Sequence, residues 1–269
     1  MIRTLFFDLD DTLLYEESVA LGAFDATCEL AAQRVGAVDR STLYTHINQS
    51  AGSLWRTVDE PEGWGRMIGI SSWEMMWGDF AVGEAPLLRK LREQSPTLRV
   101  AAWRNALQLC GVDDEGLARA LAEHFRQRLR ATIEFLPGAL DVLAVLKPRF
   151  RLGMITNGAP DVQRHKLEAA ELREWFDPIV ISGEVGVGKP RRALFEHALR
   201  LVNCAPDECV MIGNSFNRDV RGALEAGLHA VWLNLKDAEA PRGNVRFDTI
   251  AALNELPAVV ARLANGVAS

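Results

Sequence analysis

The chain has 269 residues, 48% of them hydrophobic and 25% charged, a composition typical of a globular protein with a sizeable core. Thirty basic against 36 acidic residues give a net charge of −6, which argues against a nucleic-acid polymer as a partner. No apolar run is long enough to span a membrane, and the N-terminus leads directly into a short apolar stretch ending at Asp8, unlike a signal peptide. We therefore expect a cytoplasmic protein with no membrane partner.

The cysteines and histidines give no sign of a metal or disulfide framework. The four cysteines are scattered without CxxC spacing, and the five histidines form no HxH or HxxxH pair. Paired spacings of these kinds are what zinc sites require, and a disulfide framework is typical of small secreted domains. We expect reduced thiols with structural roles.

The first predicted element is a buried strand over residues 3–8, where an apolar run stops at an acid. From residue 17 to about 130, apolar residues recur at helical spacing, with breaks at residues 61–63 and 83–86. The pattern predicts helices over residues 19–35, 41–55, 64–80, 97–110 and 114–129. Five of the seven tryptophans fall in this block, and we expect them mostly to pack between helices.

Beyond residue 137, short strands and helices alternate. The predicted strands are residues 150–156, 178–182, 208–213 and 229–234, and the predicted helices are residues 161–170, 191–202, 218–226 and a last one from about 249. Such alternation predicts a doubly wound parallel sheet of Rossmann-like α/β type, which the N-terminal strand would join. Residues 1–16 and 134–269 would then form the α/β core, and residues 17–133 an inserted helical cap that acts as a substrate lid.

Polar residues follow several of the predicted strands. The segment Asp8-Leu9-Asp10-Asp11-Thr12 places carboxylates two residues apart, a pattern that also fits an acidic turn or a helix cap. Three further elements strengthen an active-site interpretation: residues 154–158, which end in Thr-Asn-Gly; residues 186–190, which contain Lys189; and residues 210–215 followed by Asp219. Hydroxyl, backbone N–H, ammonium and carboxylate groups at strand ends suit an anion and a cation bound together.

These four elements, in this order, resemble the haloacid dehalogenase (HAD) superfamily of aspartyl-phosphate phosphatases along nearly the whole chain. The resemblance implies Asp8 as nucleophile and Asp10 as general acid/base. It also implies phosphate binding by Thr156, Asn157 and Lys189, and a Mg²⁺ site that involves Asp8, Asp10, Asn214 and Asp219. The helical insertion corresponds to the family's C1-type cap.

A narrower resemblance concerns the branch with pyrimidine 5'-nucleotidases and N-acylneuraminate-9-phosphatase. It depends on residues 156–158, Gln163, Lys166-Leu167, Phe176-Asp177 and residues 182–186. Gln163 and Lys166 also fit an ordinary solvated helix.

The residue types suit this chemistry independently of the family. A carboxylate attacks an anionic phosphate only when a cation neutralises the phosphoryl oxygens, which Mg²⁺ would do, while Lys189 and Thr156 would stabilise charge on the equatorial oxygens. Asp10 would protonate the leaving oxygen and later deprotonate water. Asn214 stands where the family most often has aspartate, so one carboxylate is missing from the predicted metal site. An amide oxygen still ligates Mg²⁺, with weaker affinity expected.

The leading hypothesis is a Mg²⁺-dependent phosphomonoesterase, a monomer or homodimer, acting on a small phosphorylated metabolite such as a nucleoside monophosphate or a sugar phosphate. A haloacid dehalogenase would use Asp8 but would need neither Mg²⁺ nor Asp10. A phosphomutase would return the phosphoryl group to its substrate. A binding or regulatory protein with the same fold, catalytically weakened through Asn214, is the alternative from outside the enzymes.

Overall fold

A computed structural model describes residues 1–36, 38–59, 63–239 and 246–265 of the chain. The chain divides into two compact units. The first contains Met1–Tyr15, Glu134–Asn157 and Lys166–Ser269, and the second contains Glu16–Ile133 and Gly158–His165. Most of the predicted break at residues 61–63, and the last four residues of the predicted core, lie outside the described residues.

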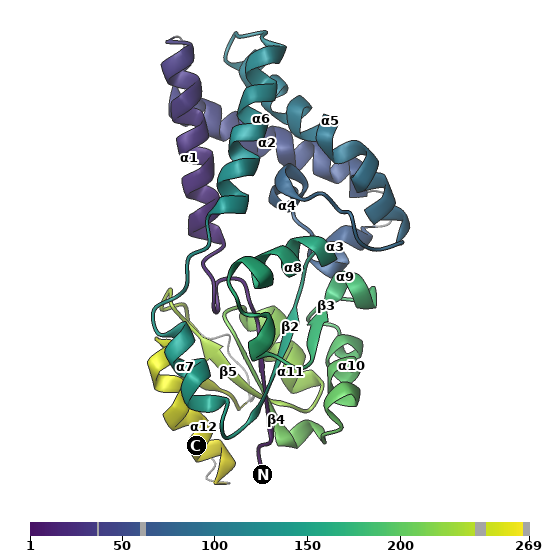
Figure 1. Ribbon diagram of the computed structural model, residues 1–269, viewed down its shortest axis with the longest axis vertical. Helices are drawn as coiled ribbons and strands as arrows, with labels where there is room; N and C mark the ends of the chain where they lie inside the picture. Colours follow the sequence, from purple (N-terminus) through teal and green to yellow (C-terminus); the bar gives the residue numbers. More distant parts are fainter. Residues whose placement is uncertain (37, 60–62, 240–245, 266–269) are drawn as a thin grey trace. The chain divides into compact units, whose positions relative to one another are not determined.

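Six parallel strands form the sheet of the first unit, in the order β3-β2-β1-β4-β5-β6, which confirms the predicted fold class (Figure 1). They are β1 (Thr4–Phe7), β2 (Arg151–Thr156), β3 (Ile179–Ile181), β4 (Cys209–Gly213), β5 (His229–Leu233) and β6 (Asp248–Ile250). All four residues of β1 are buried, as expected for a central strand covered on both faces. Strand order reverses between β1 and β4, and the carboxyl ends at such a reversal are where α/β proteins bind ligands.

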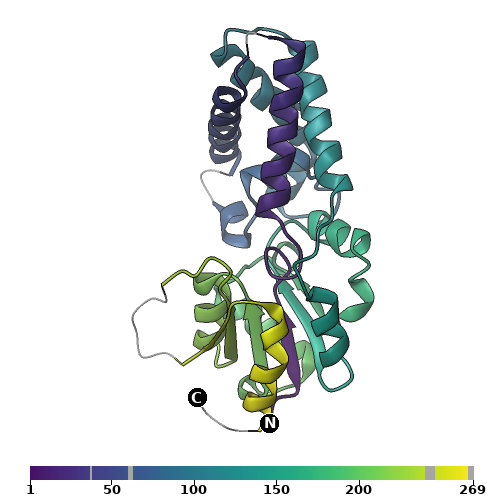
Figure 2. The same ribbon diagram turned by 90° about the vertical axis from the view of Figure 1, so that its left-hand side faces the viewer.

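Helices cover both faces of this sheet (Figures 1 and 2). On one face, α10 (Arg192–Val202) and α11 (Gly222–Glu225) pack against a core that includes Phe6 of the central strand. On the other, α7 (Ala139–Leu146) packs with α12 (Leu256–Ala264). Because side chains alternate along a strand, Leu5 and Phe7 point away from the α10 face, and both are fully buried.

The predicted strands match the observed ones to within about two residues, but several helices differ. The predicted last helix begins too early: residues 248–250 form strand β6, and α12 starts at Leu256. The predicted helix over 218–226 is a π-helical segment (Phe216–Arg221) followed by α11. Two helices were not predicted, α7 and the four-residue α9 (Ser182–Val185).

The second unit is built from α1 (Glu17–Arg34), α2 (Arg40–Asp59), α3 (Trp64–Ile68), α4 (Ser72–Trp77), α5 (Pro86–Leu109) and α6 (Glu115–Ala131). Its core centres on fully buried Phe24, Trp103 and Phe125, with the two phenylalanine rings 4.2 Å apart. Trp55 and Trp77 are also buried, as expected of tryptophans that pack between helices. The helix predicted over 64–80 is interrupted at Gly69, whose positive φ of 91° favours glycine.

Helix α8 (Pro160–Ala169) contributes residues to both units. The sequence places all of it in the α/β core, but residues 158–165 group with the helical unit. Ala159 and Val162 belong to the helical unit's hydrophobic core, and the backbone N–H of Ala159 donates to the buried carboxylate of Glu74 at 3.2 Å. Lys166, one turn further along, belongs to the α/β unit.

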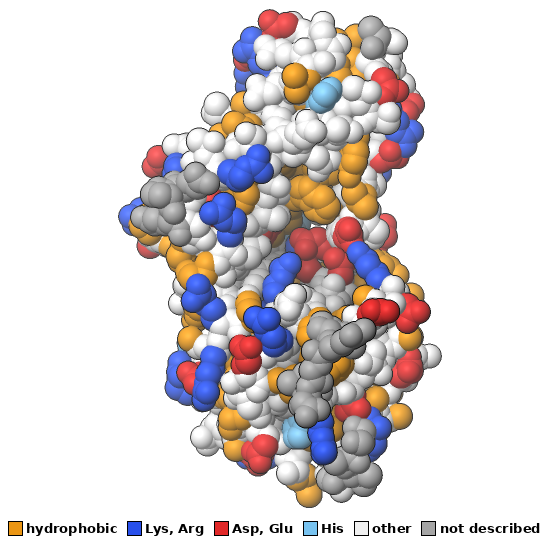
Figure 3. Space-filling model, turned by 180° about the vertical axis from the view of Figure 1, so that it is seen from behind, with side chains coloured by type: hydrophobic (Ala, Val, Ile, Leu, Met, Phe, Trp, Pro, Cys, Tyr) orange, Lys and Arg blue, Asp and Glu red, His pale blue; other side chains and the backbone are white. Residues whose placement is uncertain are grey.

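Charged side chains of both signs are interspersed on the face shown in Figure 3. Among the described helices, none combines the length and the apolar character needed to cross a bilayer.

Candidate active site

Asp8 follows the central strand directly and lies at the switch point of the sheet. Its backbone N–H donates to the carbonyl of Ile212 at 2.9 Å. This bond continues the pairing of β1 with β4 and fixes the backbone from which the Asp8 side chain extends. The Asp8 side chain is 11% exposed. A carboxylate on a rigid strand end, nearly removed from water, is well placed to act as a nucleophile.

Lys189 joins the predicted nucleophile to a second carboxylate. Its Nζ lies 2.7 Å from Asp8 Oδ1, 2.7 Å from Asp219 Oδ1 and 2.7 Å from the carbonyl oxygen of Ile155. The ammonium donates a hydrogen bond to the Ile155 carbonyl, and the two carboxylates compensate its charge as ion pairs. The Lys189 and Asp219 side chains are each 1% exposed, so this ion network is buried.

Asp219 reaches the network because of local backbone features after β4. It lies in the π-helical segment that Ser215 caps, and its Oδ2 accepts from the Ser215 N–H at 2.8 Å. A Cβ on Gly213 would lie only 2.3 Å from that same Oδ2, so a side chain there would displace the carboxylate. The absence of a side chain at residue 213 is therefore part of the site.

The predicted phosphate-binding residues follow β2 and β3. Asn157 Nδ2 donates to the Lys189 carbonyl at 3.0 Å, and the Lys189 N–H donates back to Asn157 Oδ1 at 2.8 Å. This reciprocal pair ties the loop that carries Lys189 to the end of β2. Thr156, the last residue of β2, is fully buried.

Asn214 follows β4 and is held by its backbone. Its N–H donates to Thr12 Oγ1 at 3.1 Å, and its carbonyl accepts from Trp232 Nε1 at 2.9 Å. The structure thus places the segments containing Asp8, Thr12 and Asn214 side by side. Thr12, fully buried, was part of the predicted acidic segment but was given no role of its own.

The carboxylates of the network perturb one another. Burial is the main influence on Asp8 and raises its pKa, Asp219 and Asp10 raise it further, and Lys189 opposes them, so the pKa stands at about 7. Burial lowers the pKa of Lys189, but Asp219 and Asp8 outweigh burial and the net shift is upward. Because two carboxylates share one ammonium in this buried site, the site favours the binding of a further cation.

The donor set fits a magnesium ion. Asp8 and Asp219 converge on a single cationic group, and the amide of Asn214 follows the adjacent strand end. Within the part of the chain that the structure describes, no group of three or more His, Cys, Asp or Glu side chains is arranged to hold a metal. Magnesium does not require one, because it binds proteins through one or two carboxylates and keeps several waters.

Asp10, which also belongs to the predicted metal set, pairs with a different lysine. Its Oδ1 lies 2.8 Å from Lys166 Nζ on α8. Lys166 is buried and Gln163 is fully buried, so the interpretation of these two residues as an ordinary solvated helix face is wrong. The sequence does not identify Lys166 as a site residue. Its spacing from Gln163, within the family resemblance, was the feature that could have indicated such a role.

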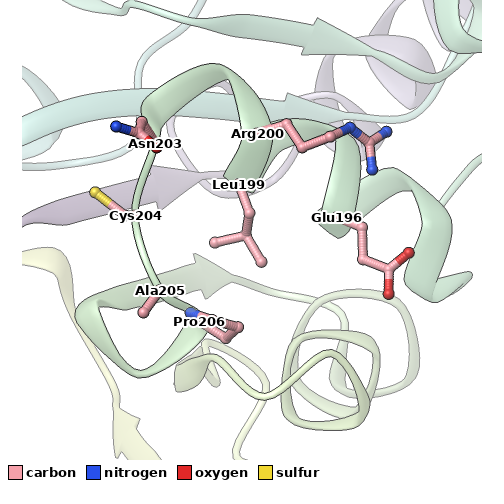
Figure 4. Close-up of a pocket in the computed structure, with 7 residues that line it drawn as sticks. All are labelled: Glu196, Leu199, Arg200, Asn203, Cys204, Ala205 and Pro206. Carbon is pink, nitrogen blue, oxygen red and sulfur yellow. The ribbon is translucent and has the colours of Figure 1, made fainter.

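A separate pocket of about 500 Å³ lies at the other end of the same sheet (Figure 4). It is lined by the end of α10 and by the loop that leads into β4: Glu196, Leu199, Arg200, Asn203, Cys204, Ala205 and Pro206. This loop precedes the amino end of β4, whereas Asp8 follows the carboxyl end of β1. The pocket is therefore distinct from the ion network.

The switch-point carboxylates place the protein in the class of doubly wound α/β enzymes that carry their chemistry at strand ends. The chain belongs to the haloacid dehalogenase-like hydrolases, whose family model matches residues 2–227. This match confirms the predicted family and shows the protein to be a hydrolase.

Several curated relatives are named phosphatases or nucleotidases. The chain is 36% identical over 235 residues to phosphoserine phosphatase of Thermus thermophilus, which covers 87% of this chain and 89% of the relative. It is 38% identical over 122 residues to pyrimidine 5'-nucleotidase YjjG of Escherichia coli (45% and 54%) and 34% identical over 172 residues to human N-acylneuraminate-9-phosphatase (61% and 67%). The narrower resemblance is thereby confirmed, and these names support the phosphatase class.

Solved structures with the same fold carry different names. The HAD-hydrolase YfnB from Bacillus subtilis, bound to magnesium, matches with a TM-score of 0.64 and 21% identity, covering 96% of this chain and 98% of that one. A 2-haloacid dehalogenase from Pseudomonas syringae matches with a TM-score of 0.61 and 25% identity, covering 97% and 99%. The fold alone therefore does not separate phosphatase from dehalogenase.

Proposed function

We propose that the protein is a Mg²⁺-dependent phosphomonoesterase that acts on a small phosphorylated metabolite through an aspartyl phosphate on Asp8. The observation that carries the proposal is the buried network in which Lys189 bridges Asp8 and Asp219. The named phosphatases among the relatives support the same reaction class.

The residues of the site divide the reaction into two steps. In the first, a carboxylate oxygen of Asp8 attacks phosphorus, the bond to the ester oxygen breaks, and Asp10 gives that oxygen a proton. In the second, Asp10 takes a proton from water, the water oxygen attacks phosphorus, and the bond from phosphorus to Asp8 breaks. Lys189, together with Thr156 and Asn157 at the end of β2, would stabilise charge on the phosphoryl oxygens.

Magnesium, when bound, would neutralise part of the phosphoryl charge and so make attack by a carboxylate feasible. We assign Asp8, Asp219 and Asn214 to its site. The carboxylate of Asp10, which pairs with Lys166, we assign to proton transfer. This division separates proton transfer from metal binding.

We propose the inserted helical segment, residues 17–133, as the lid that selects the substrate. The chain enters this segment after Tyr15 and returns at Glu134, where the Tyr15 N–H donates to the Glu134 carbonyl at 2.8 Å. Two connecting segments that leave the core and return to it at one point can act as a hinge. A lid of this kind would explain how one core chemistry serves different metabolites.

The proposed activity is tested by measuring phosphate release from p-nitrophenyl phosphate and from a panel of metabolites, each with Mg²⁺ and with EDTA. The panel includes nucleoside monophosphates, sugar phosphates and phosphoserine. We expect Mg²⁺-dependent release and a marked preference for one class. Halide release from 2-chloropropionate without Mg²⁺ would instead favour a dehalogenase, conversion of a sugar phosphate to its isomer a phosphomutase, and binding without turnover a regulatory protein.

Asn214→Asp should tighten Mg²⁺ binding. One more unit charge near a cation is worth about 1 kcal/mol or more even in water-like surroundings, so the half-saturating Mg²⁺ concentration should fall about fivefold or more. Titration calorimetry of the metal alone measures this without reference to turnover. Asn254→Asp, the same change at an exposed residue of the α/β unit, is the matched control. Equal Mg²⁺ affinity in Asn214→Asp and the control would remove Asn214 from the metal site.

A further inference from the structure

Helix α8 carries a buried lysine that the two-step reaction above does not use. The Lys166 side chain is 11% exposed, and its Nζ lies 2.8 Å from Asp10 Oδ1, whose own side chain is 17% exposed. Removing an ammonium from water is costly unless a carboxylate compensates for it. The pairing therefore accounts for the burial of Lys166, but it also fixes one oxygen of the carboxylate that must exchange protons.

The cations of the site are divided between the carboxylates. Lys189 contacts Asp8 and Asp219 at 2.7 Å each, and Lys166 contacts Asp10. The nucleophile and the acid/base thus have separate cationic partners, which come from different elements of the fold. Such a division allows the orientation of Asp10 to be set without disturbing the network around Asp8.

The backbone that presents Lys166 is well anchored. Gln163, one turn earlier on the same face of α8, is fully buried. Leu167, the next residue, is buried as well, and the Lys166 carbonyl accepts from the Ala170 N–H at 2.9 Å. A side chain that positions another group needs this kind of support, because a shift of about 1 Å in a catalytic group costs roughly 10²-fold in rate.

We infer that Lys166 is a positioning residue that holds the Asp10 carboxyl in the orientation needed to protonate the leaving oxygen and to take the proton from water. This inference rests on the proposed function. It predicts a selective defect, because only the steps in which Asp10 transfers a proton should depend on Lys166. Attack by Asp8 on a phosphate ester whose leaving group needs no proton should not.

Lys166→Met tests the inference with two substrates. With an alkyl phosphate that the enzyme accepts, we expect kcat to fall by about 10²-fold, the lower end of typical acid–base contributions, with KM within about twofold. With p-nitrophenyl phosphate, the burst of p-nitrophenolate should stay within about threefold of wild type, while the following hydrolysis of the aspartyl phosphate slows. Lys166→Arg should recover part of the alkyl phosphate rate, because it restores a cation. Lys147→Met, at an exposed lysine of the same unit, should leave both rates unchanged.

A double-mutant comparison separates positioning from a general structural effect. If Lys166 acts through Asp10, then Lys166→Met added to Asp10→Asn should cost less than about twofold beyond Asp10→Asn alone. An equal fall in the burst and in the hydrolysis step, or full additivity of the two substitutions, would overturn the inference. Lys166→Gln serves the same comparison if Lys166→Met does not fold. A wild-type protein that releases no phosphate from any ester would contradict the proposed function. Normal turnover in Lys166→Met would contradict this inference alone.

Discussion

Asp8→Asn should lower the rate of phosphate release by roughly 10⁴-fold or more, the scale of loss expected when a covalent nucleophile is removed. The substitution keeps the size and shape of the side chain, so binding of the substrate should survive. Stopped-flow or end-point assays of phosphate release, with Mg²⁺ at saturation for each protein, measure the effect.

The same variant should remain folded. The pKa of Asp8 stands at about 7 in the metal-free protein, so its carboxyl is already partly neutral near pH 7, and an amide resembles that neutral form. We expect a melting temperature in EDTA within a few degrees of wild type. Asp207→Asn, at an exposed residue beside the amino end of β4, controls for loss of a carboxylate elsewhere. An Asp8→Asn protein that keeps more than a few per cent of turnover would exclude Asp8 as the nucleophile.

Lys189→Met should cause the largest loss of stability of the substitutions discussed. It leaves Asp8 and Asp219 buried without their shared cation, and breaking a buried ion pair from one side typically costs about 3–5 kcal/mol. We expect a fall of about that size in the free energy of unfolding at pH 8 in EDTA, measured by urea titration. Lys147→Met removes an exposed lysine that donates to the Glu174 carbonyl and lies over the Trp175 ring, and it should cost about 1 kcal/mol, well below the loss in Lys189→Met.

The loss in Lys189→Met should shrink as the pH falls. The pKa of Asp8 in the folded protein is raised above its usual value of 3.8, and removing Lys189 takes away the influence that lowers it. A carboxyl with a raised folded pKa stabilises the protein at pH values below its unfolded pKa and loses that contribution as the pH rises through its folded pKa. Unfolding free energies that differ from wild type by the same amount at pH 5 and pH 8 would contradict this account of the network.

The strand ends of the site were predictable from the sequence because each short apolar run ends at a polar residue. Asp8, Thr156 and Asn214 all follow or end strands as expected. Parallel strands deliver such residues to one edge of a sheet whatever the loops between them do. This is why the position of Asp8, the proposed nucleophile, and of the loops around it could be predicted without knowledge of the packing.

The contacts that complete the site were not predictable in the same way. Lys166 and Asp10 are 156 residues apart in sequence, and nothing in a helical run of polar residues shows that one lysine is buried. The sequence predicts Gly213 as an ordinary strand end. The close approach of the Asp219 carboxylate in the structure shows why a side chain is excluded there. The start of α12 was misplaced because residues 248–250 form an edge strand too short to give an alternating pattern.

The central claim, a covalent phosphoryl intermediate on Asp8, is tested most directly by mass spectrometry of acid-quenched protein. Asp10→Asn is mixed with p-nitrophenyl phosphate and Mg²⁺, because this variant should form the aspartyl phosphate but lack the base for its hydrolysis. We predict a phosphoryl adduct on the peptide that contains Asp8, sensitive to hydroxylamine and absent when Mg²⁺ is replaced by EDTA. An adduct on any other residue, or release of p-nitrophenolate with no adduct at all, would contradict the proposed mechanism.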